Sequence, residues 1–302
     1  MMAGSSAGRR RKELRLNKYF QGFYFKQVAE DRAVALIAAT GRDEAGHPFA
    51  SIQAVLPDGT FCLPFSPEDA RIAPSGPDIR FGGNRLGASG LSVDLSGGGH
   101  SIRGSLVYGP LARPRGDIMG PFRYAPGMEC RHALISMAHT VEGSLEIDGQ
   151  VQRFDGALGY IEGDSGRSFP TRYLWTHCFP PPGGPRSIML SVAEIPYLGM
   201  RFTGVVGFIL MDGRETRLAT YLGAKVLEIQ DGRVVVRQGG DTLTVVFDRS
   251  GTIALQAPVD GGMRRAIGES LLGRATYHFS RNGSTLFEFT SENASFEYEY
   301  DR

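Results

Sequence analysis

Short segments in which apolar and polar residues alternate dominate the chain, and Asp-Gly or Gly-Gly pairs separate many of them. Residues 141–150 (VEGSLEIDGQ) place Val141, Gly143, Leu145 and Ile147 on one face of a strand and polar residues mainly on the other. Such glycine pairs supply the positive φ values of tight hairpins, and they stand at 58–59, 148–149, 212–213, 231–232 and 239–240. The pattern predicts an all-β protein built from antiparallel β-barrels or sandwiches.

One segment has a helical period instead. In residues 263–272 (MRRAIGESLL), Met263, Ile267 and Leu271 fall at i, i+4 and i+8, although Gly268 is unfavourable in a helix. We therefore treat this segment as the best helix candidate in an otherwise β-rich chain.

The domain organisation follows from a break in the strand pattern near residues 165–170, which are rich in Gly, Ser and Pro. Aromatic segments at 20–28 (FQGFYFKQV) and 169–179 (FPTRYLWTHCF) open the two halves, either as a duplicated architecture or by chance similarity. We predict a flexible basic tail at 1–16, an N-terminal β domain at 17–167 and a C-terminal β domain at 168–302, each of ordinary domain size.

Composition narrows the function classes. The 302 residues are 41% hydrophobic and 22% charged, and 33 Lys and Arg balance 32 Asp and Glu, so we expect no nucleic-acid partner. The basic run at 9–12 is typical of a flexible tail, and an arm that binds nucleic acid is the alternative. No segment has the length and apolarity of a transmembrane segment, and no signal peptide is evident. Three scattered cysteines predict buried free thiols and a cytoplasmic protein.

A pair of carboxylates is the main candidate for chemistry. Glu162 and Asp164 stand two apart in residues 159–175 (GYIEGDSGRSFPTRYLW), so in a strand they share a face with Tyr160. Burial and mutual repulsion would keep a proton on the pair and make it a general acid. The alternative is structural: the two acids cap a turn or pair with Arg167 and Arg172.

Aromatic residues could form the walls around such an acid. Tyr173, Trp175, His177 and Phe179 alternate by two and so share one strand face. Aromatic rings stabilise a nearby cation by about 0.5–2 kcal/mol each. Trp175 is the only tryptophan of the chain, and a role as a packed core residue is the alternative.

Two histidines are further candidates for proton transfer. Extending the phase of Val141 backwards along the strand puts His139 and Glu129 on the buried face, with His132 on the opposite one. A β-bulge between the two histidines would bring His132 to the same side. A purely structural role is the alternative for each of them.

Several segments together resemble the tocopherol cyclase family. They are residues 20–28, 79–95 (IRFGGNRLGASGLSVDL), 117–149 (beginning DIMGPFRYAPGMECRHALISM), 159–175, 218–226 (LATYLGAKV) and 257–273 (APVDGGMRRAIGESLLG). That family is similar to the carotenoid 1,2-hydratases, within a superfamily of two lipocalin-like β-barrels. The resemblance implies two lipocalin-like domains, a pocket for an isoprenoid-like or polyketide-like molecule, and acid-initiated addition across a double bond.

The resemblance also indicates which individual residues match the family pattern and which depart from it. The hydratases have Tyr-x-Asp where this chain has Tyr160-Ile161-Glu162, and they have a histidine at about the position of His132. The resemblance therefore favours Glu162 and His132 as catalytic residues. The chain departs from the family pattern at Gln21 and Phe23, which replace Glu and Trp, and at Gly163 and Ser165, which replace Lys and Trp.

Together, the residues and the resemblance predict a cyclase that closes a ring on a prenylated phenol or quinol, or on a similar small apolar substrate, without a metal or other cofactor. A non-catalytic binder of an apolar ligand and an isoprenoid hydratase are the alternatives. The predicted catalytic residues are Glu162, Asp164, His132 and Tyr160; the predicted substrate-binding residues are Trp175, Tyr173, His177, His139, Tyr24, Phe25 and Glu129. Lys26 is expected to be a solvated or snorkelling strand residue.

Overall fold

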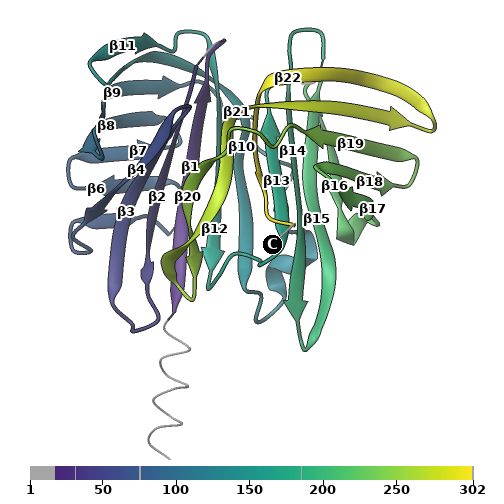
Figure 1. Ribbon diagram of the computed structural model, residues 1–302, viewed down its shortest axis with the longest axis horizontal. Helices are drawn as coiled ribbons and strands as arrows, with labels where there is room; N and C mark the ends of the chain where they lie inside the picture. The colour runs from purple at the N-terminus through teal and green to yellow at the C-terminus, as the bar shows by residue number, and fades with distance from the viewer. Residues whose placement is uncertain (1–17, 31, 75, 185, 301–302) are drawn as a thin grey trace, which may run out of the picture.

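The structure is a computed structural model that describes residues 18–30, 32–74, 76–184 and 186–300. Within these ranges the chain forms strands β1 to β22 and two short 3-10 turns, η1 (Gly120–Tyr124) and η2 (Thr220–Leu222). The strands form two antiparallel sheets that lie side by side (Figure 1). The predicted basic tail lies outside the described residues, and none of the described residues belongs to a helix long and apolar enough to cross a membrane.

The first sheet contains the strands of the N-terminal half in the order β4-β3-β2-β1-β12-β10-β9-β8-β7-β6-β5, with β11 paired to β10. Their bounds are β1 (Tyr19–Val28), β2 (Ala33–Arg42), β3 (Pro48–Leu56), β4 (Gly59–Phe65), β5 (Ala70–Ile72), β6 (Asp78–Phe81), β7 (Asn84–Gly87), β8 (Gly90–Gly97), β9 (His100–Tyr108), β10 (Cys130–Ile147), β11 (Gln150–Arg153) and β12 (Ala157–Gly166).

The second sheet contains the strands of the C-terminal half in the order β16-β15-β14-β13-β22-β21-β19-β18-β17, with β20 paired to β21. Their bounds are β13 (Tyr173–Cys178), β14 (Ser187–Tyr197), β15 (Met200–Met211), β16 (Arg214–Ala219), β17 (Lys225–Gln230), β18 (Arg233–Gln238), β19 (Asp241–Phe247), β20 (Ile253–Val259), β21 (Gly262–Arg281) and β22 (Ser284–Tyr298).

The two sheets repeat one strand order. The run β1-β2-β3-β4 matches β13-β14-β15-β16, and β12-β10-β9-β8-β7 matches β22-β21-β19-β18-β17. The aromatic segments that open the two halves, β1 and β13, therefore occupy equivalent positions. This repetition supports a duplicated architecture, and the predicted all-β fold with two lipocalin-like antiparallel domains is confirmed.

Tight turns lie where the glycine pairs predicted them. The pair 148–149 joins β10 to β11, with φ values of 51° at Asp148 and 79° at Gly149, and the other four pairs lie at the β3–β4, β15–β16, β17–β18 and β18–β19 connections. Both residues also have positive φ at 212–213 and 231–232, which matches the right-handed twist of the strands that flank a hairpin, whereas only Gly239 does at 239–240 and neither residue does at 58–59. The strand registers therefore start from turns encoded locally.

Apolar side chains form three clusters, two inside the sheets and one between them. Phe25 and Ile161 belong to the cluster inside the first sheet, and Leu174 and Phe296 to the cluster inside the second. The third cluster joins residues of both sheets, including Tyr160 and Trp175. Alternate residues of β12 and β13 thus face two different cores, and the cluster between the sheets surrounds the candidate site.

The helix predicted for residues 263–272 is wrong, because this segment lies within β21. Offsets of four and eight are even numbers, so Met263, Ile267 and Leu271 share a face in a strand as well as in a helix. The β20–β21 hairpin reaches the first sheet, where Gln53 accepts a hydrogen bond from the amide of Gln256 at 3.0 Å. The segment lies between the two sheets (Figure 1).

Candidate functional site

A cleft between the two sheets is the candidate site. Its walls come from β1, β2, β10 and β12 of the first sheet, from β13 to β15 and β20 to β22 of the second, and from η1. The lining is largely apolar and includes Tyr24, Phe122, Phe169, Tyr173 and Trp175. Its volume of about 160 Å³ is close to the roughly 150 Å³ that holds a benzene ring, so the cleft suits one ring or a similar apolar group.

His132 lies between the two predicted acids. Its Nε2 is 3.3 Å from Oε2 of Glu162, and its Nδ1 is 3.2 Å from Oδ1 of Asp164. Burial acts to lower the pKa of His132, but the two carboxylates outweigh it and raise that pKa well above its ordinary value. His132 is therefore an imidazolium cation at neutral pH, and its ring lies between two carboxylates on the cleft wall.

Glu162 is held by two further donors. The Tyr160 hydroxyl donates to Oε2 at 2.5 Å, and the Trp175 indole N–H donates to the same oxygen at 3.1 Å. Burial and the carboxylates of Glu162 and Asp164 raise the pKa of Tyr160, so its hydroxyl stays protonated. Two hydrogen-bond donors and the charged ring of His132 thus meet at one carboxylate oxygen, which fixes the orientation of this side chain in the cleft.

A bulge in β10 brings His132 to the cleft, as the sequence suggested it could. The pairing of β10 with β12 shifts register between Leu134 and Ser136 and again between Ser136 and His139. His132 is opposite Asp164 in the ladder. The phase extended backwards from Val141 is therefore wrong before the bulge, where Arg131 and Ala133 are exposed rather than buried.

The arginines of the structural alternative have other partners. Arg167 approaches Glu129 at 3.6 Å, while Arg172 donates to Glu194 at 2.7 Å. The chain turns after β12 at Gly166, whose φ is 154° and where a Cβ would lie 2.1 Å from the carbonyl oxygen of Glu129. Glycine is therefore required where the chain leaves the carboxylates.

His177 and Lys26 lie behind the cleft wall. The ring of His177 stacks on Tyr160 with a centroid distance of 3.8 Å, and Lys26 Nζ lies 3.2 Å from its Nδ1. The expectation that Lys26 is solvated is wrong, because its side chain is completely buried, and burial lowers its pKa to about 8. His177 thus packs against Tyr160 and is not one of the lining residues.

The predicted binding residues divide into two groups. Tyr24, Tyr173 and Trp175 line the cleft, whereas Phe25 faces the core inside the first sheet. His139 bonds to Ser136 at 2.9 Å and packs on Tyr108, 4.4 Å between ring centroids. Glu129 pairs with Arg167. Phe25, His139 and Glu129 are therefore placed outside the cleft lining.

The cysteines differ from one another in burial. Cys178 is buried as expected, but Cys62 is exposed and Cys130 is half-buried, and all three are free. Cys130 lines the cleft and its thiol lies 3.6 Å from Oδ1 of Asp164. The prediction of three buried thiols thus holds only for Cys178.

Two acids of the cleft region were missed in the sequence. Glu297 on β22 lines the cleft, and Glu269 on β21 is its direct cross-strand neighbour. Glu269 lies two residues from Ile267, so a strand interpretation of 263–272 would have found it. In residues 295–299 (SFEYE), Glu297 and Glu299 have the same i, i+2 spacing as Glu162 and Asp164. This spacing in the sequence could have identified Glu297 as a candidate.

The donor atoms of His132, Glu162 and Asp164 lie within 4.8 Å of one another, close enough for a metal ion. Both imidazole nitrogens, however, already face carboxylate oxygens at 3.2 and 3.3 Å. The ring thus occupies the space between the acids. This geometry is that of a charged triad, in which a central imidazolium is hydrogen-bonded to Asp164 and ion-paired with Glu162.

Comparison with known proteins identifies the fold. No protein-family model matches the chain, and no curated protein matches it. Among solved structures, CghA superposes with a TM-score of 0.58 at 15% identity, over 94% of this chain and 88% of that one. Kievitone hydratase from Nectria haematococca gives 0.54 at 11% identity, over 95% and 91%. A candidate AttH protein from Nitrosomonas europaea gives 0.51 at 10%, over 94% and 93%.

These likenesses span nearly the full length of each protein, so the two-sheet arrangement as a whole is shared. At 10–15% identity they show a common fold. They agree with the two-part β fold that the resemblance implied, and they do not single out the tocopherol cyclases.

Proposed function

We propose that this chain is a cofactor-independent enzyme that closes a ring on a prenylated phenol or quinol by acid-initiated addition of its hydroxyl across the alkene. The observation that carries the proposal is the placement of Glu162 on the wall of an apolar cleft, where it accepts hydrogen bonds from Tyr160 and Trp175 and forms an ion pair with protonated His132. Proton donation in a site that excludes water is what this reaction requires.

The proposed reaction starts with a proton held by the triad of Glu162, His132 and Asp164. His132 supplies the proton through Glu162 to the less substituted alkene carbon, and the π electrons form the new C–H bond. The cation develops on the tertiary carbon, where the face of Trp175 stabilises it. A lone pair of the phenol oxygen forms the C–O bond, and the phenolic proton returns to the triad. Substrate and product are isomers.

Water in place of the tethered hydroxyl defines a second candidate, a hydratase. It is supported by the fold shared with kievitone hydratase, a likeness of fold at 11% identity. The same triad would protonate the same alkene, and water would capture the cation. A binder without turnover would need only the cleft.

Product analysis distinguishes the three functions. The protein is incubated with prenylated quinols and with linear isoprenoids, and the products are separated and weighed by mass spectrometry. Cyclisation gives a new compound of unchanged mass, and hydration adds the mass of one water. Recovery of unchanged substrates, with tight binding measured in parallel, would refute the enzymatic proposal and leave the binder.

A further inference from the structure

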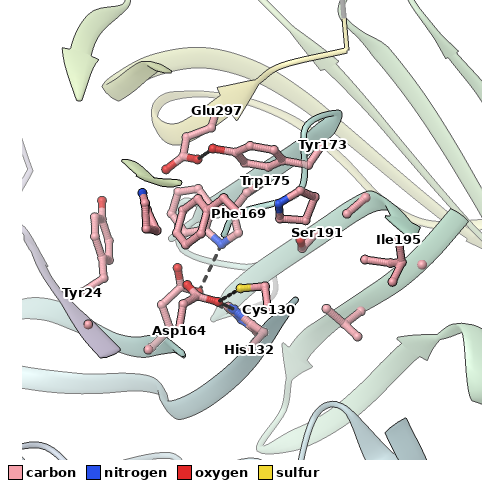
Figure 2. Close-up of a pocket in the computed structure, with 18 of the residues that line it drawn as sticks. Tyr24, Cys130, His132, Asp164, Phe169, Tyr173, Trp175, Ser191, Ile195 and Glu297 are labelled. Carbon is pink, nitrogen blue, oxygen red and sulfur yellow. Dashed lines mark hydrogen bonds and ion pairs between the residues drawn. The ribbon is translucent and has the colours of Figure 1, made fainter. Parts of the chain in front are cut away.

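A second polar group lies on the wall of the cleft that the proposed reaction does not use. Glu297 belongs to β22, and the Tyr173 hydroxyl donates a hydrogen bond to its Oε2. Figure 2 shows Glu297 and Tyr173 on one side of the rings of Trp175 and Phe169. Asp164, with His132 and Cys130, lies on the other side. The cleft therefore has two polar ends separated by aromatic rings.

Glu297 lies beside another buried acid. Glu269 is its partner across the β21–β22 ladder, and the two residues are 9% and 0% exposed. The Tyr24 hydroxyl donates to Oε1 of Glu269 at 2.8 Å, while Oε2 of Glu269 is buried without a described hydrogen-bond partner. Two carboxylates directly opposite each other in a ladder repel when both are charged.

Burial and the neighbouring acids favour the neutral form of this pair. Glu162 on β12 acts on both members and Asp164 acts on Glu297, whereas the hydrogen bonds from Tyr173 on β13 and Tyr24 on β1 and the charge of Lys26 on β1 act in the opposite direction. Arg265 on β21 and Glu299 after β22 act on Tyr173. Arg265 is bonded to Glu299 at 2.9 Å, and Lys26 lies against His177. Burial, followed by the charge of Glu269, raises the pKa of Glu297 well above its ordinary value; burial also raises the pKa of Glu269 to about 7.

We propose that Glu297 is a neutral carboxylic acid that donates a hydrogen bond to an uncharged oxygen of the ligand. Tyr173 donates to Oε2, so the carboxyl proton on Oε1 is available for a carbonyl, ether or hydroxyl acceptor. This role of Glu297 rests on the proposed use of the cleft for an apolar substrate. It adds one requirement: the substrate ring carries a second oxygen, at the end opposite the hydroxyl that reacts. A quinol or quinone ring, with oxygens at both ends, has that form.

The same arrangement excludes anionic ligands. A carboxylate or phosphate near Glu297 would lose its hydration in a largely apolar cleft, beside the partly charged Glu269 and with the acids Glu162 and Asp164 at the other end, and the single carboxyl proton of Glu297 would be its one compensating donor there. Repulsion and this loss of hydration oppose such binding. Hydrocarbons without oxygen would leave the carboxyl proton unpaired in an apolar surrounding, which is also unfavourable.

Binding measurements test this directly, because Trp175 is the only tryptophan and lines the cleft, so that its fluorescence reports occupancy. The probes are geranylacetone, the hydrocarbon analogue without its oxygen, and a prenyl carboxylate of equal length. At pH 7 we expect the ketone to bind about 5- to 150-fold more tightly than the hydrocarbon, with the carboxylate weakest. The ketone preference should fall as pH rises and Glu297 ionises, because its raised pKa keeps it neutral only below that pH.

Two variants separate the hydrogen bond from packing. Glu297→Gln keeps an N–H donor for the ligand and an oxygen for Tyr173, so it should retain the ketone preference and lose its pH dependence. Glu297→Met should bind ketone and hydrocarbon about equally. Should that variant fail to fold, the pH dependence in wild type against Glu297→Gln still decides.

The results also separate this inference from the proposed function. Retention of the ketone preference in Glu297→Met, or tightest binding of the carboxylate by the wild type, would overturn the role of Glu297. A preserved ketone preference without any turnover would remove the enzymatic proposal alone. Absence of binding by all three probes would remove both.

Discussion

Replacing Glu162 by glutamine probes the proposed acid with little change of shape. In the wild type, Oε2 accepts from the Tyr160 hydroxyl at 2.5 Å and the Trp175 indole at 3.1 Å, and Nε2 of His132 lies at 3.3 Å. The glutamine oxygen can accept from both Tyr160 and Trp175, because an amide oxygen has two lone pairs. What the variant loses is the negative charge and the ability to pass on a proton.

The magnitudes follow from these contacts. A general acid contributes about 10²–10⁴-fold to a rate, so turnover should fall by that factor. A hydrogen bond to a charged group stabilises by about 1.5–3 kcal/mol and a neutral one by about 0.5–1.5. The hydrogen bonds from Tyr160 and Trp175 each lose a charged acceptor and His132 loses one ion-pair partner, so we expect a loss of about 2–4 kcal/mol. At about 2–4 °C per kcal/mol, the melting temperature should fall by about 5–15 °C.

Three measurements on purified protein check this: turnover at saturating substrate, affinity from Trp175 fluorescence, and thermal unfolding. Glu129→Gln is the matched control, because this half-exposed acid pairs with Arg167 at 3.6 Å outside the cleft. Exposed pairs contribute about 0–1 kcal/mol, so the control should be nearly silent in all three assays. Wild-type turnover in Glu162→Gln, or an equal loss in the control, would show that Glu162 is not the acid.

Three other changes have distinct expected outcomes. The carboxylates raise the pKa of His132 in the folded protein, so the stability that its charge contributes is complete below the unfolded-state pKa of about 6.5 and is lost as pH rises through the folded-state pKa. The loss is about 1.4 kcal/mol for each pH unit between these two pKa values. Denaturant unfolding of the wild type and of His132→Gln from pH 6 to 10 measures this loss. Trp175→Phe removes one hydrogen-bond donor to Glu162 but keeps an aromatic ring, so turnover should fall less than in Glu162→Gln. The free energy of unfolding should be about 1–2 kcal/mol below that of the wild type. An equal loss of turnover in the two variants would contradict this expectation. Gly163→Ala should destabilise by about 1–3 kcal/mol, because a Cβ there lies 2.6 Å from the buried Phe23 ring and 2.9 Å from the Gly22 carbonyl oxygen; unchanged thermal unfolding would refute that packing.

Local signals determined the elements of this fold. The Asp-Gly and Gly-Gly turns predicted hairpins because positive φ is a property of the residues themselves. Alternation by two placed Glu162, Asp164 and Tyr160 on one side of β12, since strand geometry leaves no other choice. The one wrong element, residues 263–272, had apolar spacings that are even numbers and therefore fit both a helix and a strand.

The partners of those side chains were decided by tertiary structure. His132 reaches the cleft only because β10 bulges against β12, and periodicity within β10 by itself pointed it away. Glu297 and Glu269 come from strands more than 100 residues beyond Glu162, brought together by the β21–β22 ladder. The cleft exists only between two sheets, so no segment could reveal which side chains line it. Sequence thus determined which residues share a face, because that depends on neighbours along the chain; the structure decided which faces meet, because that depends on packing between distant strands.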